Sequence, residues 1–533
     1  MARRVLLAGL LLVLLAASGG HRSPSKAASR GHHHKPALKT KPGGLQTPKL
    51  VNSRAAKQAR LSDPELVTVK STNAVTFDFD DDELKQQLLN NGGYIPKSAE
   101  PFQVIEDVSS RNRLFVTTPM LRSGIPASLS TIQFDGPSGL SLKPYPSLDR
   151  HRTTEDTITD CTEQLVSIAP ITKSWKDDDT LYALDTGVLD ITTSPKQVCP
   201  PKIITFDLRT DEIANITVID TTACISLYVT LWVDPCPTGG AVAYSTDSFN
   251  FRLTVTDLAS GASKHLQSEH YSSRRRSLTR AGGSCAYPPF GLAGIAADNS
   301  CDGKMYMQSF ASNIQDVLDR KAIRDAKDGQ VMDENIQMAL PGELSGMSGP
   351  LMVDPTGELL FFPIQDDYAI YCWNTSKPHD PQNFRLLIKD KHRMKYVSSI
   401  QIDPTSGRLW VLTNRFPSFA TNTVDYSDVI YYIMYISIKG IRNVAGKVVE
   451  LPVNARDCYE RVYSGRRQSF WTGYVIRKLG VATVDASCQR CYGGTGAIDT
   501  TRVGAGCNPS PNTCIPSGLA RVDVMPYVDD SPR

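Results

Sequence analysis

The chain has 533 residues, of which 41% are hydrophobic and 21% are charged, as in ordinary globular proteins. Residues 1–70 carry 13 Lys and Arg against 2 Asp and Glu, a net of +11, so the remainder of this +3 chain holds −8. A mildly acidic body with a basic tail argues against nucleic acid as the partner of the folded part.

The first predicted element is a secretory signal peptide, which we assign to residues 1–20. Arg3 and Arg4 precede an apolar run over residues 5–17, and small residues follow it. A bilayer needs about 20 apolar residues, so this run is too short to span one, which disfavours the alternative of an uncleaved anchor. No later stretch is long and apolar enough. We therefore expect a secreted, extracellular protein that is not held in a membrane.

Residues 21–71 form the second predicted segment, a disordered basic tail. They are rich in Ser, Lys, Arg, His, Pro and Gly, and such a composition buries too little apolar surface to offset its conformational entropy. Basic tails also suit an anionic extracellular matrix, which we expect as a second partner. His32, His33 and His34 make a poor metal site in a flexible tail, so we predict no metal and no cofactor.

Residues 72–450 are predicted to form an all-β, six-bladed β-propeller. A short apolar run recurs about every 50 to 70 residues, a spacing that fits one four-stranded blade with its loops. Turn formers precede several copies, most clearly Asp354-Pro355 and Asp403-Pro404 with their following glycines. A two-sheet sandwich is the alternative that this loose pattern leaves open. The six runs lie at residues 113–117, 181–184, 241–244, 304–307, 359–362 and 408–412.

Helical signal is sparse. Residues 80–89 and 312–321 are each expected to form a short helix outside the blades, and residues 429–441 an outer strand of the last blade. Residues 451–533 change character again, with five cysteines among Gly, Pro, Ser and Thr. We predict a Cys-rich C-terminal extension that disulfides hold together.

Secretion makes the cysteines and the glycosylation motifs interpretable. Asn215 and Asn374 each begin an Asn-x-Ser/Thr motif and are predicted glycosylation sites. All 12 cysteines are disulfide candidates, and their spacing alone does not give the pairing. They are Cys161, Cys199, Cys224, Cys236, Cys285, Cys301, Cys372, Cys458, Cys488, Cys491, Cys507 and Cys514.

An ordered set of motifs from about residue 75 to 445 resembles the yellow / major royal jelly protein family. The resemblance implies the six-bladed propeller, and it covers neither the basic tail nor the Cys-rich end. Cys224, Cys285 and Cys301 depart from the pattern and are candidates for bridges private to this chain. The motifs include Arg113-Leu114-Phe115-Val116-Thr117-Thr118-Pro119, Leu184-Asp185-Thr186-Gly187, Gly291-Leu292-Ala293-Gly294 and Trp410-Val411-Leu412-Thr413-Asn414-Arg415-Phe416-Pro417.

The resemblance also implies a ligand site in the centre of the propeller. Amine-binding relatives use an Asn and a Phe of the last motif, which are Asn414 and Phe416 here, and a hydroxyl that corresponds to Ser399. A phenyl ring suits an aromatic amine or another catechol-derived ligand, while amide and hydroxyl groups orient its polar ends. The alternative is that this motif is a strand-ending turn kept for packing. Asp185-Thr186-Gly187 matches an aspartic-protease motif, but that chemistry needs a second such carboxylate, so we predict a turn there.

Three functions follow as expectations. The first is a secreted protein of an extracellular covering, cuticle or eggshell, that acts in pigmentation or hardening. The second is a dopachrome-converting tautomerase of melanin formation, which requires an acid/base pair that the sequence does not place. The third is a soluble protein that binds biogenic amines. No catalytic residue is assigned.

Overall fold

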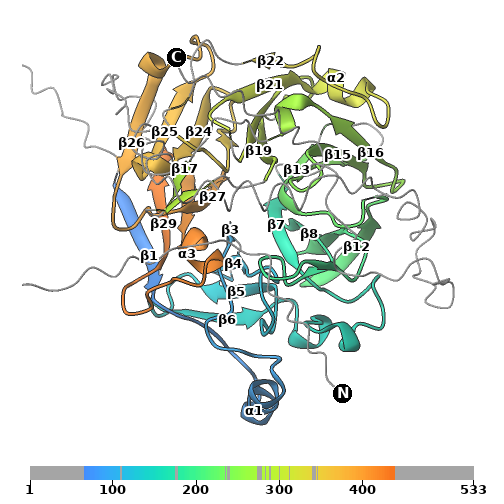
Figure 1. Cartoon of the computed structure of the whole chain (residues 1–533), viewed down its shortest axis with the longest axis vertical. Coiled ribbons are helices and arrows are strands. Elements are labelled where there is room, and N and C mark those ends of the chain that lie inside the picture. The colour runs from blue at the N-terminus through green and yellow to red at the C-terminus, as the bar shows by residue number, and fades with distance from the viewer. Residues whose placement is uncertain are drawn as a thin grey trace, which may run out of the picture.

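The computed structural model describes residues 65–438, apart from residues 109–110, 175–177, 222, 235, 237–239, 273–278, 282–283, 287–289, 299, 311, 339–343 and 345. The predicted signal peptide, nearly all of the basic tail and the Cys-rich extension therefore lie outside the described residues. The described chain is mostly strand, and its six large sheets stand as blades around a common axis (Figure 1). The predicted six-bladed β-propeller is confirmed.

Each blade is a meander whose strands run from the axis outward. The innermost strands are β3 (Gln103–Asp107), β7 (Ile168–Lys173), β13 (Tyr228–Asp234), β19 (Leu292–Ala297), β23 (Met352–Val353) and β27 (Val397–Asp403). The second strands are β4 (Arg113–Thr117), β8 (Thr180–Asp185), β14 (Val242–Asp247), β20 (Lys304–Ser309), β24 (Leu359–Ile364) and β28 (Arg408–Thr413).

The outer half of each blade completes the sheet. The third strands are β5 (Leu129–Gln133), β11 (Lys202–Asp207), β15 (Arg252–Asp257), β21 (Gln315–Asp319), β25 (Ala369–Asn374) and β29 (Tyr431–Ser437). The outermost are β6 (Leu140–Pro144), β12 (Glu212–Val218), β16 (Ser263–Gln267), β22 (Gln337–Met338), β26 (Phe384–Lys389) and β1 (Leu66–Thr72). Outside the four-stranded pattern lie β2 (Val75–Phe77), which pairs in parallel with β6, and the two hairpins β9 (Val188–Leu189) with β10 (Lys196–Gln197) and β17 (Thr279–Ala281) with β18 (Ser284–Ala286).

The six recurring apolar runs are the second strands of the six blades. These strands have a hydrogen-bonded neighbour on each side and blades packed on both faces, so nearly all their residues are buried. A strand buried on both faces needs a continuous apolar run instead of an alternating one. That requirement explains why this strand of each blade stands out in the sequence.

The predicted Asp-Pro turns join the first strand of a blade to the second. In the fifth blade, the Asp354 carboxylate accepts from the Leu359 amide at 2.8 Å, and Gly357 has φ +77°. In the sixth, Asp403 accepts from the Ser406 amide at 2.7 Å. A short acceptor side chain and a residue that tolerates positive φ are the requirements of such turns.

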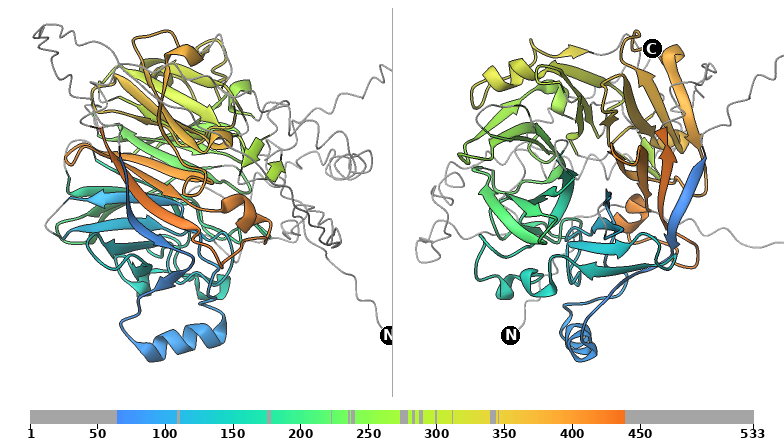
Figure 2. Two further views of the ribbon diagram at one scale, coloured as in Figure 1. Left: turned by 90° about the vertical axis from the view of Figure 1, so that its left-hand side faces the viewer. Right: turned by 180° about the vertical axis from the view of Figure 1, so that it is seen from behind.

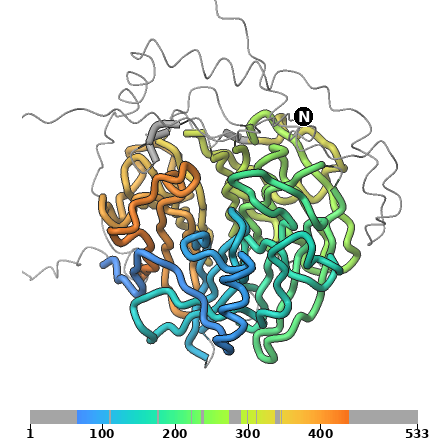
Figure 3. The backbone as a smooth tube through the Cα atoms, turned by 60° about the horizontal axis from the view of Figure 1, so that its bottom comes forward, coloured from blue at the N-terminus to red at the C-terminus, as the bar shows by residue number. Residues whose placement is uncertain are grey.

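The ring closes by a strand from the other end of the chain. β1 pairs antiparallel with β29, so Leu66 lies opposite Ile436 and Thr72 opposite Tyr431. Figures 1 and 3 show this first strand, in blue, beside the last, in orange. The propeller therefore begins at Leu66, ahead of the expected boundary at residue 72. The outer strand predicted within residues 429–441 is β29, the third strand of the last blade. A β29 without β1 would be an open sheet edge.

One of the two predicted helices is confirmed. α1 (Asp82–Asn91) overlaps the expected residues 80–89, begins after Asp81, whose carboxylate accepts from the Glu83 amide at 2.8 Å, and projects from the blades (Figure 2). The helix expected over residues 312–321 is wrong. Those residues form β21, and α2 (Arg320–Asp325) follows it. The short apolar segment was ambiguous, and pairing with β20 makes it a strand.

The remaining helical segments are single turns or little more. α3 (Phe416–Ala420) lies near the axis of the ring (Figure 1). The 3-10 turns are η1 (Leu148–Arg150), η2 (Glu155–Thr157), η3 (Glu269–Tyr271), η4 (Gln365–Asp367) and η5 (Pro381–Asn383). No helix within the described ranges is long and apolar enough to cross a bilayer.

The hydrophobic core lies between neighbouring blades. Each interface buries large side chains from the facing sheets, and the rings and branched side chains interdigitate. Between the first and second blades these include Ile105, Phe115, Leu129, Ile168, Leu181, Ile204 and Phe206. The successive inner strands also touch one another around the axis.

Two disulfides lie in the described chain. Cys236 follows β13 and pairs with Cys301, which follows β19, so this bridge joins the third blade to the fourth. Cys161 pairs with Cys199. Cys301, expected in a private bridge, is thus paired with Cys236. Cys372 is buried in β25, forms no disulfide within the described residues, and burial raises its thiol pKa to about 12.

Of the other cysteine candidates, the structure places only the Cys224 side chain within the described residues. Cys224 is half-buried, and the Cys285 side chain lies outside what the structure describes. The same holds for Cys458, Cys488, Cys491, Cys507 and Cys514.

Candidate functional site

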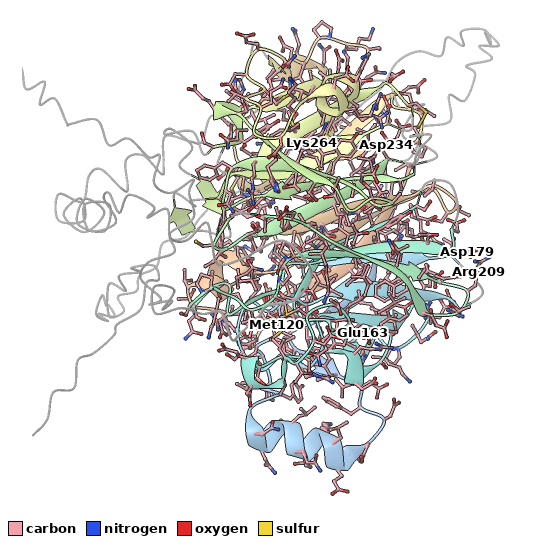
Figure 4. All side chains as sticks on the ribbon, turned by 90° about the vertical axis from the view of Figure 1, so that its right-hand side faces the viewer. Met120, Glu163, Asp179, Arg209, Asp234 and Lys264 are labelled. Atoms are coloured by element: carbon pink, nitrogen blue, oxygen red, sulfur yellow. A yellow bond between two sulfur atoms is a disulfide. The ribbon has the colours of Figure 1, made fainter. Side chains whose placement is uncertain are left out.

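The propeller has two faces that differ in chemistry. Turns between first and second strands form one face, and the segments that follow second strands or precede first strands form the other. In Figure 4, Asp179 and Asp234 lie toward the first face and Met120 lies toward the second. Asp234 ends the inner strand β13, and Met120 follows the second strand β4. We call the second face the aromatic face, because a row of rings crosses it.

Six rings form this row, which we call the aromatic arc. Each precedes an inner strand or follows a second strand, so antiparallel pairing brings all six to one face. Successive ring centroids lie 5.8, 5.7, 6.3, 5.7 and 5.9 Å apart, within the range of favourable aromatic pairs. In that order the rings are Phe249, Phe290, Phe310, Tyr396, Phe416 and Phe102.

Phe416 is the fifth ring of the arc and lies between Tyr396 and Phe102. Its ring is half-buried and lies tilted on Tyr396 and edge-on to Phe102. Met347, which enters the fifth blade, packs in the same cluster. The predicted ligand residue Phe416 is therefore part of an aromatic surface that four blades build, and a planar aromatic molecule fits such a surface.

Asn414 is fully buried and joins the last blade to the first. Its side-chain amide donates to the Pro101 carbonyl at 2.8 Å, and its amide oxygen accepts from the Phe416 backbone amide at 3.0 Å. Both ends of the side chain thus bind backbone. These bonds position Phe416 relative to β3, as the packing interpretation of the motif expects, and a direct contact of Asn414 with a ligand stays a prediction.

Ser399 lies one strand away, on the inner strand β27. It is buried, and its hydroxyl finds no partner within the described part of the chain. Alternation along a strand places it on the same side of β27 as Gln401, which lines a small cavity at the opposite face. An unsatisfied buried hydroxyl is costly, so this group is available to a ligand or a water molecule.

Glu100 is a buried carboxylate that sequence reasoning missed. It is 0% exposed, accepts a hydrogen bond from the Tyr431 hydroxyl at 2.7 Å and lies 3.3 Å from the Arg415 backbone amide. Burial raises the pKa of Glu100 to about 8, although these bonds and the charges of Arg415 and Arg122 act in the opposite direction. A buried carboxyl whose pKa is raised toward neutral pH, next to a row of aromatic rings, is a candidate functional group.

Glu106 shows what a structural carboxylate looks like in the same blade. It lies at the end of β3 nearer the opposite face, where it pairs with Arg408 and accepts from the indole of Trp410 at 2.8 Å. A small cavity beside it contains Lys173, which bridges Asp178 and Asp403 at 3.1 and 3.4 Å. Glu106 and Lys173, which line this cavity, are thus each paired with opposite charges.

The Asp-Thr-Gly segment is a turn, as predicted. The Asp185 carboxylate accepts from the backbone amides of Val166, Ser167 and Gly187 at 2.7 to 3.0 Å. These bonds use the carboxylate to join β8 to the approach to β7. No group of three or more metal-ligating side chains occurs within the residues that the structure describes.

Both predicted glycosylation sites lie on the surface. Asn215 is exposed on the outermost strand β12 of the second blade, and Asn374 is exposed at the end of β25. Their side chains also make local contacts, from Asn215 to the Thr217 hydroxyl at 3.1 Å and from the Ser376 amide to Asn374 at 2.9 Å. Glycosylation itself stays a prediction.

The fold is a six-bladed propeller, and a row of six aromatic rings crosses one of its faces. Comparison with known proteins is more specific, because the major royal jelly protein model matches residues 177–445, half of the chain. The chain belongs to the major royal jelly protein family.

Similar proteins include Protein yellow of Drosophila melanogaster, which is 28% identical over 380 residues that span 68% of this chain and 67% of that one. Protein yellow of Drosophila simulans matches to the same extent. Dopaminechrome tautomerase of Drosophila melanogaster is 26% identical over 425 residues, 73% of this chain and 86% of that one.

Proposed function

We propose that this protein is a secreted yellow-type protein of an extracellular covering, cuticle or eggshell, and that it acts there in pigmentation or hardening. We propose further that it binds small aromatic amines, or related catechol-derived molecules, on the aromatic arc. The observation that carries the binding proposal is the arc itself. The buried hydroxyl of Ser399, on the inner strand β27, has no partner within the described residues and is a further candidate group. The relatives named Protein yellow support the family role, and the apolar run over residues 5–17 supports secretion.

Calorimetric titration with serotonin, dopamine and octopamine tests the binding proposal. We expect binding by the wild-type protein and a loss of about tenfold or more in the variant Phe416→Ala, because it removes the ring between Tyr396 and Phe102. Phe79→Ala is the matched control, since Phe79 packs on Phe77 and Tyr94 near α1. Equal affinities in wild type and Phe416→Ala would remove the arc as the binding site.

Localisation tests the role in an extracellular covering. Antibodies against the protein should label the cuticle or the eggshell. Labelling confined to soluble fluid would instead favour the third function, a free amine-binding protein. Localisation is needed for this distinction, because both functions use the same arc and amine binding alone does not separate them.

A tautomerase activity is the second candidate function. It is supported by the relative named dopaminechrome tautomerase, which this chain matches over 86% of that protein. Tautomerisation needs a group that exchanges a proton near neutral pH, and Glu100, with a pKa of about 8, is such a group beside the arc. Purified protein that converts neither L-dopachrome nor dopaminechrome faster than buffer alone would exclude this function.

A further inference from the structure

Glu100 is wholly buried, yet no cation pairs with it among the described residues. Its hydrogen bonds come from the Tyr431 hydroxyl and the Arg415 backbone amide, both of which are uncharged donors. Glu106 of the same blade, in contrast, has the Arg408 guanidinium against it. Burying an ionised carboxylate without a cation costs free energy, so such a group either takes up a proton or pairs with a bound cation.

The groups around Glu100 come from five segments of the chain, and none is a close cation. Tyr431 of β29 donates to it directly. Burial raises the pKa values of Tyr396, which precedes β27, and of Tyr426, in the loop before β29, and the charge of Glu100 adds to both shifts. Arg415 after β28 and Arg122 after β4 act on it only through their fields, without an ion pair. Three tyrosines thus surround Glu100, and no cation of the described residues forms an ion pair with it.

The position of Glu100 connects it to the aromatic arc on both sides. Along the chain, it lies two residues before Phe102, the last ring of the arc. Across the blades, the amide that faces it belongs to Arg415, between Asn414 and Phe416. The Tyr396 ring packs on Phe416 and also responds to the charge of Glu100. Carboxylate and rings therefore belong to one cluster.

We propose that Glu100 is the ammonium-binding group of the aromatic arc, and that the site selects protonated arylalkylamines over neutral aromatic molecules of the same shape. The inference rests on the proposed amine-binding function and adds to it the group that recognises the charge. The ring of the ligand packs against Tyr396, Phe416 and Phe102, and its ammonium pairs with the ionised carboxylate. The ammonium then offsets the cost of ionising this buried carboxyl.

Binding by this route is coupled to release of a proton. In the free protein near pH 7 the Glu100 carboxyl is largely protonated, since its pKa lies at about 8. When the ammonium binds, the carboxyl O–H bond breaks, the proton passes to buffer, and the amine keeps its own proton. Amine affinity should therefore rise from pH 6 to pH 8, and each amine should release about one proton at pH 7.

The first experiment compares serotonin with 5-hydroxyindole, which has the same ring system and hydroxyl without the aminoethyl group. Titrations at pH 7 in two buffers of different ionisation enthalpy measure the protons released. We expect about one proton for serotonin and none for 5-hydroxyindole. In Glu100→Gln, serotonin should bind about tenfold or more weakly without proton release, while 5-hydroxyindole keeps its affinity.

Outcomes of this comparison separate the two proposals. Serotonin binding to Glu100→Gln with unchanged affinity and proton release would overturn the role of Glu100 and leave amine binding on the arc intact. Absence of binding of both molecules to the wild-type protein would overturn both proposals. Glu163→Gln is the matched control, because Glu163 is an exposed glutamate whose nearest cation is Arg150 at 3.4 Å.

Tyr431→Phe provides a second test that does not require removal of the carboxylate. The Tyr431 hydroxyl stabilises the charged form of Glu100, so its loss should raise the pKa of Glu100. The pH midpoint of the rise in serotonin affinity should move upward in this variant. An unchanged midpoint in a folded Tyr431→Phe protein would contradict the proposal.

Discussion

At the scale of single residues, side chains with a structural role can be told apart from candidates for ligand binding. Asn414 binds backbone at both ends, so its first duty is to hold Phe416 against the start of the first blade. Ser399 and Glu100 differ from it, because one has no partner within the described chain and the other has only uncharged ones. Buried polar groups that lack a hydrogen-bond partner or a counter-charge are the groups that a ligand can satisfy.

Glu100 should also make the stability of the protein depend on pH. Its pKa is about 8 in the folded protein and near 4.5 when unfolded, so the folded state binds the proton more tightly. The protonated Glu100 carboxyl therefore adds about 2 to 5 kcal/mol to the free energy of unfolding. This contribution is fully present below pH 4.5 and is lost as the pH rises through 8. Urea denaturation at pH 5 and pH 8 should show this fall in the wild type and a smaller one in Glu100→Gln. If the free energy of unfolding fell by the same amount from pH 5 to pH 8 in both proteins, Glu100 would not be buried and protonated in the folded state.

At the scale of elements, the strand that closes the ring matters most. β1 is contributed by the beginning of the described chain, and it buries Leu66 and Lys70 against the last blade and the neighbouring blade. The Lys70 ammonium donates to the carbonyls of Gly136 and Pro137 at 2.7 and 2.8 Å. The first and last blades are therefore joined by backbone pairing and by a buried cation.

Removal of β1 should destabilise the whole propeller. A protein that begins at residue 73 would expose the edge of β29 and lose the burial of Leu66, at a cost of about 3 kcal/mol or more. Thermal denaturation should show a lower midpoint and earlier aggregation than in the control that begins at residue 65. Identical midpoints for the two truncations would show that β1 does not close the ring in solution.

At the scale of the whole molecule, a disulfide links two neighbouring blades of the ring. The Cys236–Cys301 bridge joins turns of the third and fourth blades at the face opposite the arc. A bridge across 65 residues restricts the unfolded chain, and its effect does not depend on the aromatic face.

Replacement of both cysteines in Cys236→Ala/Cys301→Ala should lower the free energy of unfolding by about 2 to 4 kcal/mol. Amine affinity should stay unchanged, because the bridge and the arc lie at opposite faces of the propeller. Denaturation and titration of the same preparation measure both quantities. A large loss of affinity in the folded double variant would contradict this separation of the two faces.

Much of the fold was predictable, because the relevant information is local. Six apolar runs at blade spacing, each a strand buried on both faces, predicted the six blades, and Asp354 and Asp403 marked the turns that precede two of them. The helix expected over residues 312–321 was wrong because pairing with β20, remote in sequence, decides that segment. Phe416 was found through the family resemblance and does lie in the aromatic surface.

The amino-acid sequence by itself thus determined the number of blades, their order and one ring of the candidate site. Only the tertiary structure showed that rings from four blades form one arc, that β1 closes the ring, and that Glu100 lies buried beside Arg415. The reason is that burial and proximity arise between residues more than 300 positions apart, such as Glu100 and Tyr431. Periodicity along the chain reports the neighbours within a strand, whereas the charge state of Glu100 depends on side chains that only folding brings together.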